Sequence, residues 1–491
     1  MDYKKILKEI KPTELEIEKV HEIARDAINY INNKSKEENI DVEAKLVGSI
    51  AKGTWLSGSS DIDIFINFQL ESDEDYLKEK GLYLGYECSK HLNGIAEEHY
   101  ASHPYLTSHI NGYDVDFVPC YKIYNAEELK SAVDRTILHT NYIQKHLKTE
   151  KQKEEVLLLK RFMSAVGTYG SEFKVGGFAG YLCEILILRY NNFEETLKAA
   201  SNWRNKTVID LKNYKTEKSF KDPLIAIDPT DKNRNVGAAL KKEKMAEFVI
   251  ASRNFLNSDE KDKIKFFYRI NPENYYNKKY NENKYNKKKY NNKHNKELNL
   301  ENSYKSVYEQ FKDRKTKTIT IKFNIPDIPV DSIHPQLKKT QESIEEKLED
   351  NDFSVFKSDY WTDEKKIGLF IFELNVYKQS NYYIHEGPKV WDRKACDNFI
   401  KSHPENYYII EDKLVLNKKR QFNSAKDFIK NILTKENINN IKVGKNMKCL
   451  LIDTYKLNTM KNLLKEELLN ENLELMEFLD DFLNPGQLLK R

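Results

Sequence analysis

The feature that most constrains this fold is a glycine-serine turn followed, about a dozen residues later, by two alternating aspartates, within LVGSIAKGTWLSGSSDIDIFINF. Residues 42–47 alternate apolar with polar side chains, and residues 62–68 do so more strongly, so both predict strands. Between them, Gly48 and Ser49 predict a turn that opens a short helix through Lys52, whose free N–H groups favour an anion. The stretch therefore predicts a strand, a turn with a short helix, and a second strand.

The paired aspartates indicate a metal-dependent chemistry. On a strand, Asp61 and Asp63 point to the same side, opposite the apolar residues. Two carboxylates at that spacing repel each other unless cations lie between them. A third acid comes from GYDVDFVPCYK, which predicts a strand over residues 113–119 with Asp114 and Asp116 on one face, and periodicity does not choose between those two. Three such carboxylates suit two Mg²⁺ ions that activate a hydroxyl and clamp phosphates, as nucleotidyl transfer requires.

A surface hairpin is the plain structural alternative, since an Asp-x-Asp pair near a Gly-Ser turn also occurs there. The complete stretch is more specific than the pair, because it adds Lys52 three positions after Ser49, a spacer and a third acid on another strand. We therefore expect an active site of the polymerase type.

Further segments of the chain point in the same direction. They are EHYASHPYLTSHINGYDVDFVPCYK, SAVDRTILHTNYI, LLLKRFMSAVGTYGSEFKVGGFAGYLCEILI, AIDPTDKNRNVGAAL, HPQL at 334–337, GPKVWDRKACDNFIKSH and VGKNMKCLL. Together with the acidic stretch, these segments closely resemble the archaeal-type CCA-adding enzymes, which are tRNA nucleotidyltransferases of the polymerase-beta-like superfamily. The resemblance covers most of the chain except one insert.

The resemblance implies an α+β multidomain protein. Its expected parts are a polymerase-beta-like nucleotidyltransferase catalytic (head) domain at 1–149, a helical central nucleotide-binding (neck) domain at 150–258, an Asn-, Lys- and Tyr-rich linker or insert at 259–303, and an α+β carboxy-terminal body and tail at 304–491. The body and tail would bind the acceptor stem and elbow of tRNA. A length of 491 residues agrees with several domains.

The resemblance also implies roles for the acidic stretch. Asp61, Asp63 and Asp116 match the three catalytic acids that bind Mg²⁺, and this match favours Asp116 over Asp114. Ser49 and Lys52 match positions that hold the triphosphate of ATP or CTP. The family often has arginine where Lys52 stands, and lysine keeps the charge without the planar bidentate grip.

Four further residues match nucleotide-binding positions of the family. His139, Lys160 and Tyr169 would contact the incoming ATP or CTP, with Lys160 neutralising phosphate charge. Arg234, within IDPTDKNRNV, would face the incoming base and serve base selection, because a guanidinium offers several fixed donors. Taken without the family, the same residues fit a turn, a partly buried histidine, a solvated lysine and a tyrosine at the edge of a core.

The implied activity is template-independent addition and repair of the 3′-terminal CCA of tRNA from CTP and ATP, with release of pyrophosphate. A related nucleotidyltransferase that adds poly(A) or makes oligoadenylate would share the acids but not the CCA order, and the IDPTDKNRNV segment argues against it. A non-catalytic RNA-binding protein of the same fold is the alternative from another class. Its weakness is that all three acids are intact.

The cellular setting expected from the sequence is cytoplasmic. Five scattered cysteines form no C-x-x-C pair, which argues against zinc and against a disulfide framework. The charged start, MDYKKILKEIKPTELEIEKV, has no signal-peptide pattern, and no apolar run reaches membrane-spanning length. We therefore expect no membrane partner.

The insert carries most of the excess positive charge. Residues 271–297 contain eight Lys and three Glu, a net charge of +5, whereas the whole chain is only +4. Overall basicity therefore argues little for RNA binding by the folded domains. The insert has no apolar period and is typical of a disordered linker. We favour compositional drift over an electrostatic tether with base-stacking tyrosines.

The remaining elements can be predicted coarsely. Thr13 and Glu16 form a candidate capping box before a helix that backs the catalytic sheet. The pattern is mainly helical over residues 150–257. After the insert we expect a strand, a helix and a strand at 317–323, 336–348 and 367–377. The amphipathic run 457–483 predicts a helix, for which packing on the tail, a homodimer contact or neither stays open.

Overall fold

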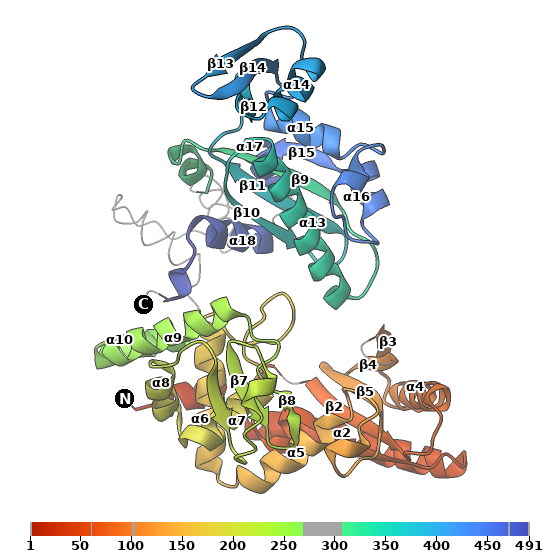
Figure 1. The fold of residues 1–491 in the computed structure, drawn as a ribbon. Helices are drawn as coiled ribbons and strands as arrows, with labels where there is room; N and C mark the ends of the chain where they lie inside the picture. Colours follow the sequence, from red (N-terminus) through yellow and green to blue (C-terminus); the bar gives the residue numbers. More distant parts are fainter. Residues whose placement is uncertain (1, 60, 101–103, 269–306, 470–471, 490–491) are drawn as a thin grey trace, which may run out of the picture. The chain divides into compact units, whose positions relative to one another are not determined.

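The computed structural model describes residues 2–59, 61–100, 104–268, 307–469 and 472–489, in two compact units. Unit 1 comprises residues 1–270 and 486–491, and unit 2 comprises residues 271–485 (Figure 1). Each unit has hydrophobic clusters of its own, which lie in the head and neck of unit 1 and in the body of unit 2. The predicted insert at 271–297 lies outside the described residues.

The head contains a mixed five-stranded sheet of order β1-β2-β5-β4-β3. Only β2 and β5 run parallel, and their neighbours are antiparallel. The strands are β1 (Val42–Leu46), β2 (Asp61–Phe68), β3 (Ile95–Tyr100), β4 (Pro104–Ile110) and β5 (Tyr113–Tyr121). The head helices are α2 (Glu14–Glu37), α3 (Gly48–Lys52), α4 (Glu74–His91) and α5 (Arg135–His146), with a short turn η1 (Ala126–Glu128). The predicted strand, turn with short helix, and strand are confirmed.

Alternation along β2 decides which face of the sheet carries the acids. Ile62, Ile64, Ile66 and Phe68 are fully buried against α2 and α4, which pack on the sheet and contact each other. The odd-numbered residues point to the opposite face, where Phe65 packs with Ile137 of α5. The predicted capping box of Thr13 and Glu16 begins α2 and is confirmed.

The neck is helical with an additional small sheet. Its helices are α1 (Lys4–Ile10), α6 (Glu150–Ala165), α7 (Gly180–Tyr190), α8 (Phe193–Ala200), α9 (Lys242–Asn257) and α10 (Glu260–Lys263), with turns η2 (Glu217–Ser219), η3 (Ile264–Phe267) and η5 (Gln487–Leu489). The sheet has the order β6-β7-β8, from β6 (Thr207–Asp210), β7 (Leu224–Asp228) and β8 (Asp231–Asn235). The mainly helical prediction missed this sheet, because strands of four or five residues have too few periods to be detected.

The body of unit 2 is a four-stranded sheet of order β10-β11-β9-β15 with helices on both faces. Phe370 and Phe372 of β11 pack towards α13, whereas Leu369 and Ile371 pack with residues of α17 and α18. The elements are β9 (Lys317–Asn324), α13 (Val330–Asp350), β10 (Val355–Thr362), β11 (Ile367–Leu374), α15 (Ala425–Ile432), η4 (Ile438–Asn440), α16 (Lys448–Thr454), β15 (Lys456–Thr459), α17 (Met460–Leu469) and α18 (Leu473–Leu483). The three elements predicted after the insert are confirmed, and α13 begins six residues earlier than expected.

The predicted single helix over 457–483 is wrong. Its first residues form the edge strand β15, which pairs with β9, and the remainder divides into α17 and α18. Apolar residues of both helices cover the sheet and pack with Trp361 of β10. Both helices pack on the body sheet and not on the tail, so the first of the three alternatives is not observed, and a homodimer contact through this run stays a prediction.

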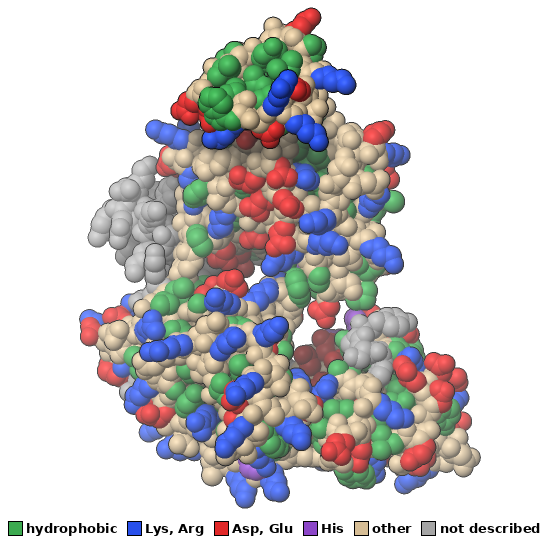
Figure 2. All heavy atoms as spheres, in the orientation of Figure 1, with side chains coloured by type: hydrophobic (Ala, Val, Ile, Leu, Met, Phe, Trp, Pro, Cys, Tyr) green, Lys and Arg blue, Asp and Glu red, His purple; other side chains and the backbone are tan. Residues whose placement is uncertain are grey.

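The tail is a small sheet of order β12-β14-β13, from β12 (Tyr382–Lys389), β13 (Tyr407–Ile410) and β14 (Lys413–Lys419), with α14 (Arg393–Ser402) packed on β12. Figure 2 shows hydrophobic side chains gathered over the tail. Ile384, Tyr408 and Ile409 are among its exposed residues. Among the described residues, no helix combines the length and the apolar character needed to cross a bilayer.

Candidate active site

The three predicted acids come from two neighbouring parallel strands. In the register of β2 and β5, Asp63 lies opposite Asp116 and Asp61 lies opposite Asp114. Because residues paired across parallel strands point to the same face, all four carboxylates share one face of the sheet. This is the face turned away from α2 and α4.

The pKa values of Asp61, Asp63 and Asp116 are all raised. Burial, together with the charges of Asp116 and Asp61, raises the pKa of Asp63 to about 7. Burial and the charge of Asp114 raise the pKa of Asp61. The pKa of Asp116 is also raised, chiefly by burial. Such shifts mean that negative charge here lacks compensation, which is the state that a bound cation relieves.

Thr107 of β4 fixes the orientation of Asp116. The two residues are partners in the β4–β5 register, and the hydroxyl of Thr107 donates a hydrogen bond of 2.6 Å to Asp116 Oδ1. This bond favours the ionised carboxylate and opposes the effect of burial on the pKa of Asp116. Asp114 instead lies at an exposed site, 3.0 Å from His109 Nδ1.

Gly48 lets the turn approach the carboxylate of Asp63. Its φ of +73° lies in the left-handed region, and a Cβ at this position would lie 1.9 Å from Asp63 Oδ2. The backbone is thus in direct contact with the acid. Ser49 follows in the first turn of α3 and is half-buried.

Lys52 and Lys160 share one buried carboxylate. Lys52 Nζ lies 2.7 Å from Glu184 Oε2 and Lys160 Nζ lies 3.8 Å from Glu184 Oε1. Thr54 Oγ1 donates to Glu184 at 2.5 Å, and Lys160 donates to the Thr54 carbonyl at 2.8 Å. Glu184 is fully buried, with the two lysines 9% and 2% exposed. Two lysines therefore face one carboxylate, and burial together with the charge of Lys52 lowers the pKa of Lys160.

Tyr169 lies beside this lysine cluster. A Cβ on Gly180, the first residue of α7, would lie 3.2 Å from the Tyr169 hydroxyl and 3.3 Å from Lys160 Nζ. Burial raises the pKa of Tyr169, so its hydroxyl keeps its proton and can donate a hydrogen bond. Lys160 and Tyr169 thus meet at the start of one helix.

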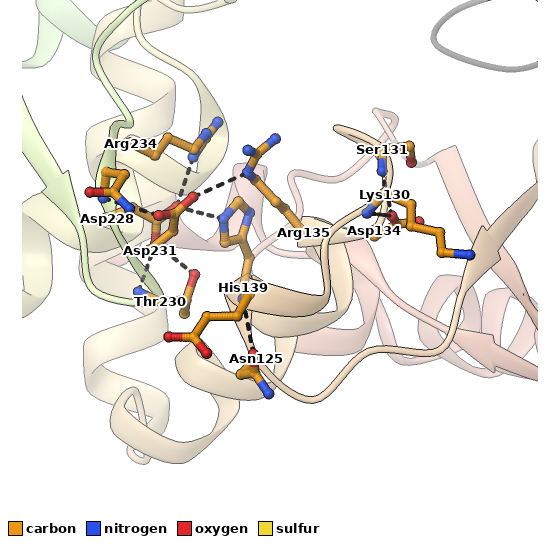
Figure 3. A network of polar contacts seen from close by, with 12 residues as sticks. Asn125, Lys130, Ser131, Asp134, Arg135, His139, Asp228, Thr230, Asp231 and Arg234 are labelled. Atoms are coloured by element: carbon orange, nitrogen blue, oxygen red, sulfur yellow. Dashed lines mark hydrogen bonds and ion pairs between the residues drawn. The ribbon is translucent and has the colours of Figure 1, made fainter. Parts of the chain in front are cut away.

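His139 and Arg234 meet at a second buried carboxylate, Asp228 (Figure 3). His139 Nε2 lies 2.8 Å from Asp228 Oδ2, and Arg234 Nη1 donates to the same oxygen at 2.9 Å. Burial lowers the pKa of His139, so the ring is neutral with the Nε2 proton directed at Asp228. Tyr181 stacks on the His139 ring with centroids 3.9 Å apart.

Tyr181 also connects the two clusters. The Lys52 ammonium lies 5.8 Å from the centroid of the Tyr181 ring, on which His139 stacks. The charge of Lys52 also acts on Asp63, whose pKa it lowers. Lys52 therefore lies close to both the acidic face and the His139 network, and the sequence-predicted residues of unit 1 form one neighbourhood.

The donor set of the acidic face suits Mg²⁺, which prefers hard carboxylate oxygens. In the described part of the chain, no three His, Cys, Asp or Glu side chains already stand in the arrangement of a closed metal cage. The residues fit the ion by chemistry and by position on the strands.

Sequence reasoning missed three residues of the site: Thr107, Glu184 and Asp228. Each is hydrogen-bonded to a predicted residue of another element: Thr107 to Asp116, Glu184 to Lys52, and Asp228 to His139. The two members of these pairs are 9, 132 and 89 positions apart in the sequence, respectively. The one usable signal was the Asp-Pro pair at 228–229 after a buried strand, which had indicated only a turn.

Three family models match the chain in succession. The nucleotidyltransferase domain matches residues 28–139, the second domain of tRNA nucleotidyltransferase matches 154–268, and the C-terminal domain of CCA-adding enzyme matches 314–459. The acids lie in the first match, and Asp228 and Arg234 lie in the second.

Curated relatives match all or most of the chain. A CCA-adding enzyme of Methanothermobacter thermautotrophicus is 42% identical and covers 100% of this chain and 99% of its own. The enzymes of Methanosarcina mazei and Methanocaldococcus jannaschii are 35% and 36% identical, each over 90% of this chain and over 89% and 92% of their own lengths. The solved structure of a cytoplasmic RNA terminal U-transferase is 14% identical, with a TM-score of 0.44 over 54% of this chain and 97% of that chain.

Proposed function

This chain belongs to the CCA-adding enzymes, and from that premise we propose how its residues divide the work of adding CCA to the 3′ end of tRNA from CTP and ATP. The observation that carries the proposal is the acidic face of β2 and β5 beside the Gly48 turn. The division into a head (1–149), a neck (150–258), a linker (259–303) and a body with tail (304–491) belongs to the same proposal, with the correction that α1 and η3 pack into the neck core and so belong to the neck. A cytoplasmic location is also part of the proposal.

Asp61, Asp63 and Asp116 would hold Mg²⁺. When bound, the ion would lower the pKa of the tRNA 3′-hydroxyl and neutralise charge on the α-phosphate. Support comes from the carboxylate oxygens and from the raised pKa of Asp63. Thr107 holds Asp116 in place, and Gly48 allows the turn to reach Asp63.

The triphosphate would be held by Ser49, Lys52, Lys160 and Tyr169, and pyrophosphate would leave towards them. The electrostatic support for this role is that two lysines share one glutamate and that the pKa of Lys160 is lowered by burial and by Lys52, a condition that a bound anion relieves. Arg234, with His139 beside it, would face the base. The body and tail would hold the acceptor stem and elbow of tRNA, where an RNA duplex is held by shape, phosphates and 2′-hydroxyls.

Asp63→Asn and Asp116→Asn test the metal role, with Asp114→Asn as the matched control from the same strand face. The first two should reduce CMP incorporation by more than about a hundredfold, since loss of even an outer-shell partner of a metal costs up to about that much. Asp114→Asn should keep near-normal activity. Each variant is assayed with labelled CTP and Mg²⁺, and tRNA binding is measured in parallel and should not change.

Wild-type product identity separates the candidate activities. Transcripts ending at the discriminator base, at C and at CC should each be completed to CCA and extended no further. Long A tails would instead identify a poly(A)-type enzyme, and absence of incorporation would leave an RNA-binding role. Full activity of both Asp63→Asn and Asp116→Asn would refute the assignment of these residues as metal ligands, and the family membership of the chain would still hold.

A further inference from the structure

Asp228, at the end of β7, accepts an unusually large number of hydrogen bonds. Its Oδ2 accepts hydrogen bonds from His139 Nε2 at 2.8 Å and from Arg234 Nη1 at 2.9 Å. Its Oδ1 receives the Tyr181 hydroxyl at 3.2 Å, the Thr230 amide at 2.9 Å and the Thr230 hydroxyl at 2.7 Å. The donors come from α5, α7, β8 and the turn between β7 and β8. One carboxylate thus joins four segments of unit 1.

The carboxylate of Asp228 stays ionised although it is buried. Asp228 is fully buried, and burial alone would favour its neutral form. The hydrogen bonds from His139 and Thr230 outweigh burial and hold the pKa of Asp228 well below its usual range. With His139 neutral, the carboxylate's charge is matched by Arg234.

Arg234 depends on this partner for its orientation. Its side chain is 33% exposed and leaves the short strand β8 to line a pocket of about 460 Å³, together with Arg135 and Asn233. A long arginine side chain at a half-open site has many rotamers, and fixing one costs entropy. The bond from Nη1 to Asp228 fixes one edge of the guanidinium, so that its remaining donors hold constant directions.

We propose that Asp228 is a positioning residue for base selection, which orients Arg234 directly and keeps His139 and Tyr181 in register beside it. The inference rests on the proposed base-selecting role of Arg234. Asp228 itself touches no substrate, and its effect passes through the guanidinium. A site that distinguishes bases by hydrogen bonds needs donors of fixed direction, because a mobile donor can satisfy a wrong base as well as a right one.

Stability alone does not account for such a group. Replacement of a buried ion pair by apolar residues of similar volume is often neutral or stabilising. The free energy of folding therefore does not explain a buried, charged carboxylate that accepts five hydrogen bonds. Its role is to orient the side chains that donate those bonds. The nearby Asp231 differs, since its carboxylate lies 3.6 Å from Arg135 Nε and is half-buried.

The test is nucleotide discrimination by Asp228→Asn, with Asp231→Asn as the matched control. The amide keeps the shape and removes the charge. On a transcript ending at the discriminator base, we expect the ratio of kcat/KM for CTP to kcat/KM for UTP to fall about tenfold or more, the effect of losing one charge-assisted hydrogen bond. Asp231→Asn should keep the wild-type ratio.

A double variant distinguishes positioning from general damage. If Asp228 acts through Arg234, then adding Asp228→Asn to Arg234→Lys should lower the ratio no further. Independent losses in the double variant, or an unchanged ratio in Asp228→Asn, would overturn the inference. Wild-type enzyme that fails to add CCA would instead refute the proposed function, so the two failures are distinguishable.

Tyr181→Phe carries the test if Asp228→Asn does not fold. It removes one hydroxyl donor to Asp228 and leaves the charge and the ring that stacks on His139. The CTP-to-UTP ratio should then fall in the same direction by about threefold, the effect of a neutral hydrogen bond. A melting temperature near that of wild type with an unchanged ratio would contradict the inference.

Discussion

Gly48 shows how one missing side chain shapes the site. A Cβ at this position would be disfavoured for two reasons: the left-handed backbone conformation and the close contact with Asp63. Gly58 allows the two effects to be measured separately, because its φ of +71° is nearly the same and nothing lies within 4 Å of a Cβ there. The pair offers a test of whether the close approach to Asp63 serves catalysis.

We expect Gly48→Ala to abolish most nucleotide incorporation, since the added methyl displaces the Asp63 carboxylate. Gly58→Ala should lower stability by about 1–2 kcal/mol, the cost of alanine in the left-handed region, and leave kcat unchanged. The measurements are thermal melting and steady-state kinetics over a range of Mg²⁺ concentrations. Equal activity of the two variants would show that the contact between the turn and Asp63 has no role in the reaction.

Single residues also show what a sequence can reveal about a site. The acids of β2 and β5 were predictable, because strand periodicity fixes their face. Glu184 and Asp228 were not, because a buried anion is recognisable only by the cations that surround it. Those cations come from segments remote in the chain, such as Lys52 and His139.

Among the elements, α7 connects the head to the neck. It supplies Glu184, which binds Lys52 of α3 and faces Lys160 of α6, and it supplies Tyr181 on the next turn. This helix is thus the common support of both proposed nucleotide-binding clusters. Its sequence, GYLCEILILRY, is almost entirely apolar and contains a single glutamate.

We expect Glu184→Gln to lower the free energy of unfolding of unit 1 by about 3–5 kcal/mol, because breaking a buried pair leaves uncompensated charge. Glu195→Gln is the control, since its ion pair with Lys198 is exposed and is expected to contribute little. Urea unfolding followed by far-UV circular dichroism measures both. A Glu184→Gln protein as stable as Glu195→Gln would show that the two lysines do not need this carboxylate.

Elements with many periods were predicted well, and short ones were not. The capping box began α2 as expected, and β9 and β11 were recognised by alternation. The strands β6, β7 and β8 were missed, and the run 457–483 was taken as one helix. In that run β15 forms because β9 offers a partner edge, which is information that no local pattern contains.

On the scale of the whole molecule, the two units are joined twice by the chain. Residues 486–491 belong to unit 1, although the preceding α18 belongs to unit 2. Leu489 packs against the neck core, and Asn254 of α9 donates a hydrogen bond of 2.7 Å to its carbonyl. The last described turn, η5, therefore contributes to the stability of a unit formed mainly by the first half of the chain.

We expect Leu489→Ala to loosen unit 1 and to leave unit 2 unchanged. Loss of one partly buried leucine costs about 1–2 kcal/mol, so amide exchange in α9 should accelerate by about tenfold while β9 and β11 keep their protection. Leu473→Ala, at an exposed site in α18, is the control. Hydrogen exchange read by mass spectrometry reports all segments at once, and faster exchange in β9 and β11 would contradict the assignment of η5 to unit 1.

Local sequence patterns were sufficient to predict the strand, turn and strand over 42–68, the shared face of the acids, the start of α2, and the α+β character of the body. These features depend on periodicity and capping, which act over a few residues. The folded structure was needed to show that Glu184 and Asp228 are the anions around which Lys52, Lys160, His139 and Arg234 gather. The reason is that a buried charge is stabilised by groups brought from distant segments, and only the folded chain brings them together.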